Sequence, residues 1–280
     1  THAFTTVSTG GFSPHTASLA HYESAALEWL AILFMFIAGT SFPMLYRVLR
    51  GRPGPLLRSV EFRTYCGVVL LAAGVIFLTA DAGPRNLEAV RHSLFMVISI
   101  SSSTGYASND YALWSDAAKG VMLIVMPLGA MSGSTAGGIM MVRFVAVASF
   151  AHRSSLGQLH SRLVRPVRVG SSSLDDEVAN QVVGLVILAL AAFGGGSVLI
   201  ILTGTDLVTG FSASATSFGN VGPGLGAVGS DFLAIPVFGR LVSVVLMLLG
   251  RLEIYPILLA LVKLPIPRFR PMLARLTRPE

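Results

Sequence analysis

SISSSTGY, at residues 99–106, is a short polar segment that ends an apolar run in a glycine turn. Similar segments stand at residues 3–12 (AFTTVSTGGF) and 216–223 (TSFGNVGP). We align the three on the pairs Thr9-Gly10, Thr104-Gly105 and Val221-Gly222. This repetition predicts a fold built from one recurring unit. Between membrane-spanning segments, such a turn can present backbone carbonyls that replace the water shell of a cation. The pattern therefore indicates part of a cation pore.

Composition indicates an all-α membrane protein. Hydrophobic residues make up 53% of the 280 residues and charged residues only 12%, whereas soluble domains contain about 25% charged residues. The single cysteine, Cys66, excludes a disulfide framework within the chain. The chain opens inside a repeat unit without an initiator methionine, so we expect a fragment that lacks its own N-terminal part.

Five apolar segments are predicted to span the membrane, at residues 24–49, 65–80, 117–150, 178–203 and 232–264. Pro43 is expected to kink the end of the first, and a Gly/Ser-rich centre interrupts the third. Residues 87–102 and 206–218 are too short or too polar to cross about 30 Å of hydrocarbon. They suit re-entrant pore helices.

Fifteen of the twenty Lys and Arg residues fall on one face of this arrangement, which the positive-inside rule makes cytoplasmic. They are Arg47, Arg50, Arg52, Arg58, Arg63, Arg143, Arg153, Arg162, Arg165, Arg168, Lys263, Arg268, Arg270, Arg275 and Arg278. Acidic residues gather on the opposite face, where they can concentrate cations. The net charge of +6 therefore reflects topology, and nothing in it supports nucleic-acid binding.

Five motifs now follow one another along the chain: STGGFS at 8–13, STGY at 103–106, GSTAGGI at 133–139, NVGPG at 220–224 and GRLE at 250–253. With this ordered set, the chain resembles the C-terminal part of the TrkH/KtrB-type potassium transporter subunits, bacterial relatives of the plant HKT transporters. The resemblance implies repeated units of helix, re-entrant pore helix, filter loop and helix around one pore, of which this chain supplies the last three of four.

The implied domains are a truncated second pore unit at 1–49, a cytoplasmic loop at 50–64 and a third pore unit at 65–150. A second cytoplasmic loop at 151–177, a fourth pore unit at 178–264 and a cytoplasmic tail at 265–280 follow.

The resemblance also implies the residues of the selectivity filter, which are Thr9, Gly10, Thr104, Gly105, Val221 and Gly222. Glycine tolerates the backbone angles that aim a carbonyl at the pore axis and leaves room for an ion. Three filter glycines favour potassium over sodium, because in this family a serine at a filter position is associated with sodium transport. The alternative is that these are ordinary glycine-containing turns.

Residues 127–138, PLGAMSGSTAGG, hold four glycines in the middle of a predicted span, where a continuous helix is unfavourable. The resemblance makes residues 129–138 an intramembrane loop that gates the pore beneath the filter. A small-residue helix-packing face is the alternative. Met140 stands where the family usually has a lysine, so we expect gating or regulator coupling to differ. The expected gate residues are Gly129, Gly133, Ser134, Thr135, Gly137, Gly138 and Arg251.

Arg251 and Glu253 lie inside the fifth apolar segment. Charged side chains at bilayer depth are costly unless they are paired or hydrated, so both are functional candidates. The resemblance places Arg251 beside the pore below the filter. The alternative is a structural ion pair with no part in conduction.

We therefore predict potassium uptake across the bacterial inner membrane, with the potassium ion as substrate and with no cofactor, catalytic residue or further metal site. The resemblance implies a homodimer, a cytoplasmic nucleotide-binding regulatory subunit and membrane lipid as partners. A sodium-conducting protein or an ion-coupled secondary transporter remains open. An intramembrane enzyme is disfavoured, because no H-E-x-x-H or G-x-S-x-G motif occurs.

Overall fold

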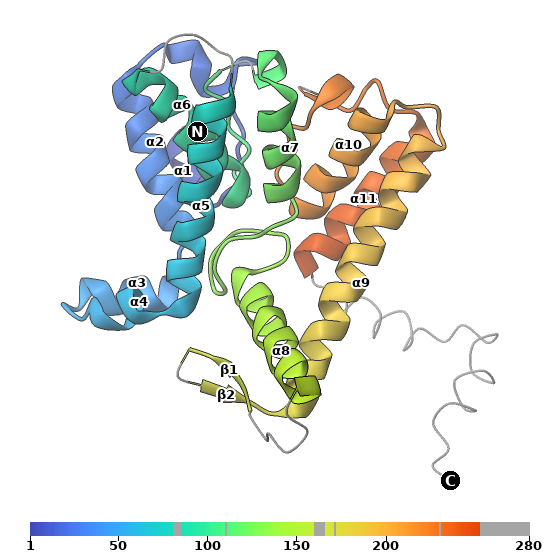
Figure 1. Ribbon diagram of the computed structural model, residues 1–280. Coiled ribbons are helices and arrows are strands. Elements are labelled where there is room, and N and C mark those ends of the chain that lie inside the picture. Colours follow the sequence, from blue (N-terminus) through green and yellow to red (C-terminus); the bar gives the residue numbers. More distant parts are fainter. Residues whose placement is uncertain (81–85, 110, 160–165, 171, 230, 253–280) are drawn as a thin grey trace, which may run out of the picture.

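Helices form most of the molecule (Figure 1). The computed structural model describes residues 1–280 apart from 81–85, 110, 160–165, 171, 230 and 253–280. The helices are α1 (His2–Val7), α2 (Ala25–Ala38), α3 (Phe42–Leu49), α4 (Gly54–Arg58), α5 (Val60–Thr79), α6 (Leu87–Ser101), α7 (Asp116–Val125), α8 (Met141–Leu159), α9 (Asp176–Ile201), α10 (Leu207–Gly219) and α11 (Val237–Leu252). Strands β1 (Val167–Val169) and β2 (Ser172–Leu174) pair antiparallel in a small hairpin.

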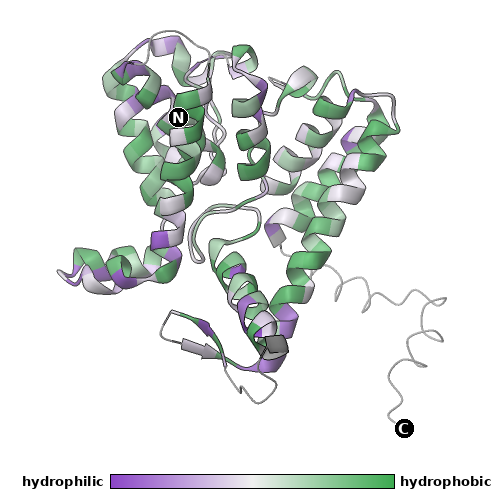
Figure 2. Ribbon diagram, viewed as in Figure 1, coloured by the Kyte–Doolittle hydropathy of each residue, from purple (hydrophilic) through white to green (hydrophobic). Residues whose placement is uncertain are grey.

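Two helices of the described part, α5 with 20 residues and α9 with 26, are each long and apolar enough to cross a membrane. Large apolar side chains on both face outward; Leu71 is 70% exposed and Ile187 is 60% exposed. Figure 2 shows the hydrophobic residues along the upright helices, and hydrophilic ones gather around α4, the end of α8 and the hairpin. The predicted all-α membrane class is confirmed.

The first predicted span, residues 24–49, differs from the prediction of one helix kinked near Pro43. The helix ends at Ala38, and α3 leaves at an angle of 107° to α2 (Figure 1). Pro43 lies in the first turn of α3, where its missing N–H has no intrahelical partner to lose. The break therefore falls at residues 39–41, before the proline.

The interruption of the third predicted span is confirmed. Residues 126–140 between α7 and α8 are not helical, and they are called the α7–α8 loop from here on. With ten residues, α7 is about 15 Å long and cannot cross the bilayer alone. The end of the fifth predicted span, residues 253–264, lies outside the described residues.

The two predicted re-entrant segments are the short helices α6 and α10. Side chains cap both, because Asn86 accepts from the Ala89 N–H and Asp206 accepts from the Thr209 N–H, each at 3.0 Å. Both helices are buried over their C-terminal halves. They therefore point the glycine-bearing turns that follow them into the interior of the molecule.

Candidate ion filter and the loop beneath it

The three glycine turns (residues 9–12, 103–106 and 220–223) leave α1, α6 and α10 with one backbone pattern. In the middle turn, the Thr104 N–H donates to the Ser99 carbonyl at 2.9 Å. The equivalent pairs are Gly10 with Thr5 at 2.8 Å and Val221 with Thr216 at 3.0 Å. The repeat seen in the sequence is thus a repeat of backbone geometry.

A hydroxyl group closes each turn from the helix side. Ser99 Oγ donates to the Tyr106 carbonyl at 2.7 Å. The equivalent bonds run from Thr5 Oγ1 to the Phe12 carbonyl and from Thr216 Oγ1 to the Pro223 carbonyl, both at 3.0 Å. A Ser or Thr hydroxyl of each polar segment therefore satisfies a backbone carbonyl of the turn that follows it.

These hydrogen bonds define a register that differs from the sequence alignment by one residue in the first turn. Each turn contains two residues with a positive φ angle, which confirm this register. They are Thr9 and Gly11 in the first turn, Ser103 and Gly105 in the second, and Asn220 and Gly222 in the third. Gly11, and not Gly10, is the structural equivalent of Gly105 and Gly222. The alignment of Gly10 with the other two glycines is therefore wrong. The aromatic residue that follows Gly11 and Gly105 was the signal that could have given the correct register.

The turns pack against one another through their glycines. A Cβ added at Gly11 would lie 1.8 Å from the Thr104 carbonyl oxygen, and one at Gly105 would lie 1.9 Å from the Val221 carbonyl oxygen. No side chain fits at either position, and the positive φ independently favours glycine. A Cβ at Gly222 would meet no heavy atom of the described residues within 4 Å. Each of the first two turns thus fits its glycine against a carbonyl of the next.

Tyr106 links the second turn to α1. Its fully buried side chain places the hydroxyl 2.5 Å from Thr5 Oγ1 and donates to the His2 carbonyl at 3.1 Å. Since Thr5 also closes the first turn, the two turns share one hydrogen-bond network. Local sequence patterns do not predict this contact, because it joins residues 101 positions apart.

The α7–α8 loop folds back on itself below α6 and α10 (Figure 1). The Gly129 N–H donates to the Ile139 carbonyl at 2.8 Å, and the Ile139 N–H donates to the Pro127 carbonyl at 3.0 Å. The Met141 N–H donates to the Ala130 carbonyl at 3.0 Å. The two arms of the loop therefore satisfy each other's backbone in place of a helix, which excludes the alternative of a helical packing face.

The tip of this loop touches all three glycine turns. Thr9 Oγ1 donates to the Thr135 carbonyl at 2.9 Å, and the Gly137 N–H donates to Ser103 Oγ at 3.1 Å. A Cβ at Gly137 would lie 3.0 Å from Asn220 Cβ, in the third turn. One short segment thus lies against the base of every described turn.

The other predicted gate residues shape the loop. A Cβ at Gly129 would lie 2.3 Å from the Gly137 carbonyl oxygen, so the arms can approach only without side chains there. Gly133 and Gly138 both have a φ of +76°. Ser134 Oγ donates to the Met131 carbonyl at 2.6 Å and closes a local turn.

The break between α2 and α3 binds the α7–α8 loop through backbone hydrogen bonds. The Met131 N–H donates to the Gly39 carbonyl at 3.1 Å, and the Phe42 N–H donates to the Gly133 carbonyl at 3.0 Å. These backbone groups are free for the loop because no helix continues through residues 39–41. Sequence reasoning missed this role, although the sequence GTS before Phe42 and Pro43 is a signal for a break.

Arg251 lies on α11 next to the loop. The neighbouring Gly250 carbonyl accepts from the Gly138 N–H at 3.3 Å, and a Cβ at Gly250 would lie 1.8 Å from the Phe218 carbonyl oxygen. Asn220 Nδ2 donates to the Met247 carbonyl at 3.2 Å, which fixes α11 to the third turn. The Arg251 side chain is exposed. Glu253, the other charged residue of this segment, lies outside the described residues, so the alternative of a structural ion pair is not tested.

Charged groups near the N-terminal ends of α2, α6 and α10 are held in place by specific partners. Glu28 of α2 pairs with Arg91 of α6 at 2.6 Å, and both side chains are largely buried. Hydrogen bonds from the side chain and backbone of Thr209 lower the pKa of Asp206, so this carboxylate stays ionised at neutral pH. The acidic residues predicted on the face opposite to the basic ones are Asp81, Glu88, Asp110, Asp116, Asp206 and Asp231, of which Asp81 and Asp110 lie outside the described residues.

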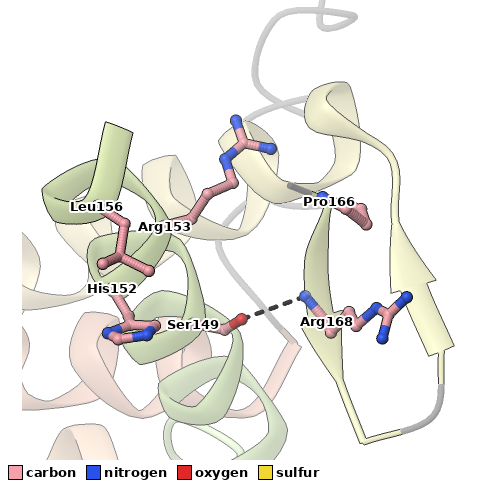
Figure 3. A pocket seen from close by; sticks show the side chains of 6 residues that line it. All are labelled: Ser149, His152, Arg153, Leu156, Pro166 and Arg168. Carbon is pink, nitrogen blue, oxygen red and sulfur yellow. Dashed lines mark hydrogen bonds between the residues drawn. The ribbon is translucent and has the colours of Figure 1, made fainter. Parts of the chain in front are cut away.

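A cavity of about 460 Å³ lies far from the turns, between the end of α8 and β1. Figure 3 shows its lining residues Ser149, His152, Arg153, Leu156, Pro166 and Arg168. Arg153 is paired with Asp176, and the guanidinium groups of Arg153 and Arg168 point in different directions. The cavity is therefore not an assembled anion site.

Among the described residues, no three His, Cys, Asp or Glu side chains are placed to hold a metal ion.

The family model described as "TrkH: Cation transport protein" matches residues 1–82 and 82–270. The chain belongs to the TrkH cation transport family. This family consists of membrane cation transport proteins and not of enzymes, so the predicted class of protein is confirmed at the level of the family.

Relatives with curated names support the same assignment. "Trk system potassium uptake protein TrkH" of Halomonas elongata is 30% identical over 262 residues, which cover 91% of this chain and 54% of that protein. "Trk system potassium uptake protein TrkI" of the same organism is 34% identical over 269 residues, with 93% and 54% covered. The crystal structure of the potassium transporter TrkH from Vibrio parahaemolyticus matches with a TM-score of 0.86 at 29% identity, over 94% of this chain and 57% of that one. The chain thus spans about half the length of these relatives.

Proposed function

We propose that this chain supplies three of the four pore units of a protein that takes up potassium through a filter of backbone carbonyls. The observation that carries the proposal is the row of three equivalent turns, in which glycines pack against the carbonyls of neighbouring turns. Backbone carbonyls can replace the hydration shell of potassium. The names of the related potassium uptake proteins support the choice of ion.

The filter residues of the proposal follow the structural register. They are Gly10, Gly11, Thr104, Gly105, Val221 and Gly222, with Gly11 in the role first expected of Gly10. Thr9 keeps a role at the base of the filter, because its hydroxyl contacts the α7–α8 loop. Glycine in all three turns favours potassium over sodium.

The gate of the proposal is the tip of the α7–α8 loop, because it lies against all three turns. Moving the tip away would open the path below the filter. Arg251, one residue from the contact between α11 and the loop, would add a positive charge that opposes cation flow in the closed state. Glycine-rich backbone with few side-chain contacts is suited to such movement.

The division into second, third and fourth pore units with cytoplasmic connections remains a proposal. We also propose that the protein lies in the bacterial inner membrane. Its proposed partners are a second copy of the chain, a nucleotide-binding regulatory subunit and membrane lipid. Membership of a family whose relatives are named Trk system proteins is consistent with a multi-component system.

The test is the influx of rubidium, as a potassium substitute, and of sodium into proteoliposomes that contain the complete protein. We expect rubidium influx that potassium blocks, and we expect Gly105→Ser to admit sodium, because its Cβ displaces the Val221 carbonyl. Gly120→Ser is the matched control, since a Cβ at Gly120 of α7 meets no described heavy atom within 4 Å. Sodium influx alone, or a rubidium influx that needs a sodium gradient, would favour the alternative functions. Unchanged selectivity in Gly105→Ser would contradict the filter assignment.

A further inference from the structure

Glu61 is a buried carboxylate that neither the filter nor the predicted gate accounts for. It is the second residue of α5, and only 7% of it is exposed. A buried carboxylate is costly unless hydrogen bonds compensate for its lost hydration. Its partners therefore reveal why the position holds a charge.

The two backbone groups near the Glu61 carboxylate lie on either side of the tip of the α7–α8 loop, one within the loop and one in α8. Oε1 accepts from the Ser132 N–H at 2.6 Å, and the Val142 N–H lies close enough to stabilise the charge of the carboxylate. Ser132 precedes the tip of the loop, and Val142 lies in the first turn of α8, just after it. One side chain therefore joins the two ends of the segment that contacts the glycine turns.

The chemistry of the two donors suits an anion. The Val142 N–H is one of the first four of α8, which have no intrahelical acceptor, and the helix dipole favours negative charge there. Hydrogen bonds to an ionised acceptor are roughly twice as strong as neutral ones. The loop's bonds to the α2–α3 break and to the turns are between neutral groups. An ionised Glu61 thus supplies the loop with a charge-assisted hydrogen bond, to the Ser132 N–H.

We propose that Glu61 is the positioning residue that holds the α7–α8 loop against the three glycine turns. The consequence for conduction rests on the proposed function of the loop as a gate. Removing the carboxylate leaves the Ser132 N–H without its acceptor and the Val142 N–H without a neighbouring negative charge. This shifts the loop toward positions in which its tip is released.

The experiment uses the complete protein in lipid nanodiscs for hydrogen exchange and in proteoliposomes for rubidium influx. Glu61→Gln keeps the shape of the side chain and removes its charge, and Glu61→Ala removes both acceptors. We expect exchange of the peptide that covers residues 128–140 to accelerate about tenfold in Glu61→Gln, which corresponds to about 1.4 kcal/mol, and more in Glu61→Ala. Rubidium influx should rise in the same order, with the rubidium-to-sodium ratio unchanged because the filter is untouched.

Two controls separate the carboxylate's role from general damage. Glu177→Gln makes the same chemical change at an exposed residue of α9, and Ser132→Ala keeps the backbone donor while removing the side-chain hydroxyl. Both should leave the exchange of the loop at the wild-type level. Peptides from α9 report whether the fold is intact, and they should exchange alike in all variants.

Wild-type exchange of the loop in both Glu61 variants would overturn the proposal, as would faster exchange throughout α9, which would reveal a general structural role. Faster loop exchange with reduced influx would also overturn it, since Glu61 would then support conduction and not restrain the loop. Faster loop exchange in a protein that shows no cation influx in any form, wild type included, would support the positioning role and contradict the proposed function instead.

Discussion

Replacing Gly11 or Gly10 by alanine separates the two filter registers, because the structure assigns these adjacent glycines different surroundings. At Gly11 the added Cβ lies 1.8 Å from the Thr104 carbonyl oxygen, and φ is +65°. An alanine with a left-handed backbone costs about 1–2 kcal/mol, and overpacking adds about 1–3 kcal/mol. At Gly10 the Cβ lies 3.3 Å from the side chains of Phe12 and Ser8, which can shift, so we expect a cost below about 1 kcal/mol.

The two costs at Gly11 add to about 2–5 kcal/mol. The atom that the added Cβ would displace is the carbonyl oxygen of Thr104, which is a proposed filter group. We therefore expect Gly11→Ala to lower the rubidium-to-sodium influx ratio by at least tenfold, since about 1.4 kcal/mol corresponds to a factor of ten. Gly10→Ala should change the ratio less than threefold, or about 0.6 kcal/mol by the same conversion. Influx is measured in proteoliposomes at matched amounts of folded protein, judged by size-exclusion chromatography. Equal effects of the two variants, or a larger effect of Gly10→Ala, would refute the structural register.

Three further predictions test the surroundings of the filter. Tyr106→Phe removes the hydroxyl that joins two turns, at a cost of about 1–3 kcal/mol, and should reduce the rubidium-to-sodium ratio; Tyr46→Phe, at an exposed residue of α3, should not. Gly129→Ala pushes the arms of the α7–α8 loop apart and should raise rubidium influx severalfold, and a fall in influx would argue against a gate. Glu28→Gln breaks the buried pair with Arg91 and should reduce stability by about 3–5 kcal/mol, measured as thermal unfolding in detergent. Glu88→Gln is the control, because Glu88 also pairs with Arg91 but its side chain is 61% exposed. A similar loss of stability in this variant would show that the burial of Glu28 does not cause the loss in Glu28→Gln.

The sequence by itself determined the class of the protein and the kind of element that carries its site. Low charge and long apolar segments predict membrane helices, because each residue of a span needs an apolar side chain and a backbone that is hydrogen-bonded within the protein. The glycine and serine content of residues 127–138 predicted a break in a helix for an equally local reason. The three turns were visible because their Ser, Thr and Gly residues recur in the same order. These are properties of neighbouring residues.

The tertiary structure decided the contacts that distinguish Gly11 from Gly10 and those that the α7–α8 loop makes. Gly11 is distinguished from Gly10 by the carbonyl of Thr104, more than ninety positions away. Glu61 finds its donor Ser132 across 71 positions of the chain. No periodicity or propensity encodes such pairs, because they arise only when separate helices pack and each buried polar group takes the partner that the packing brings within reach.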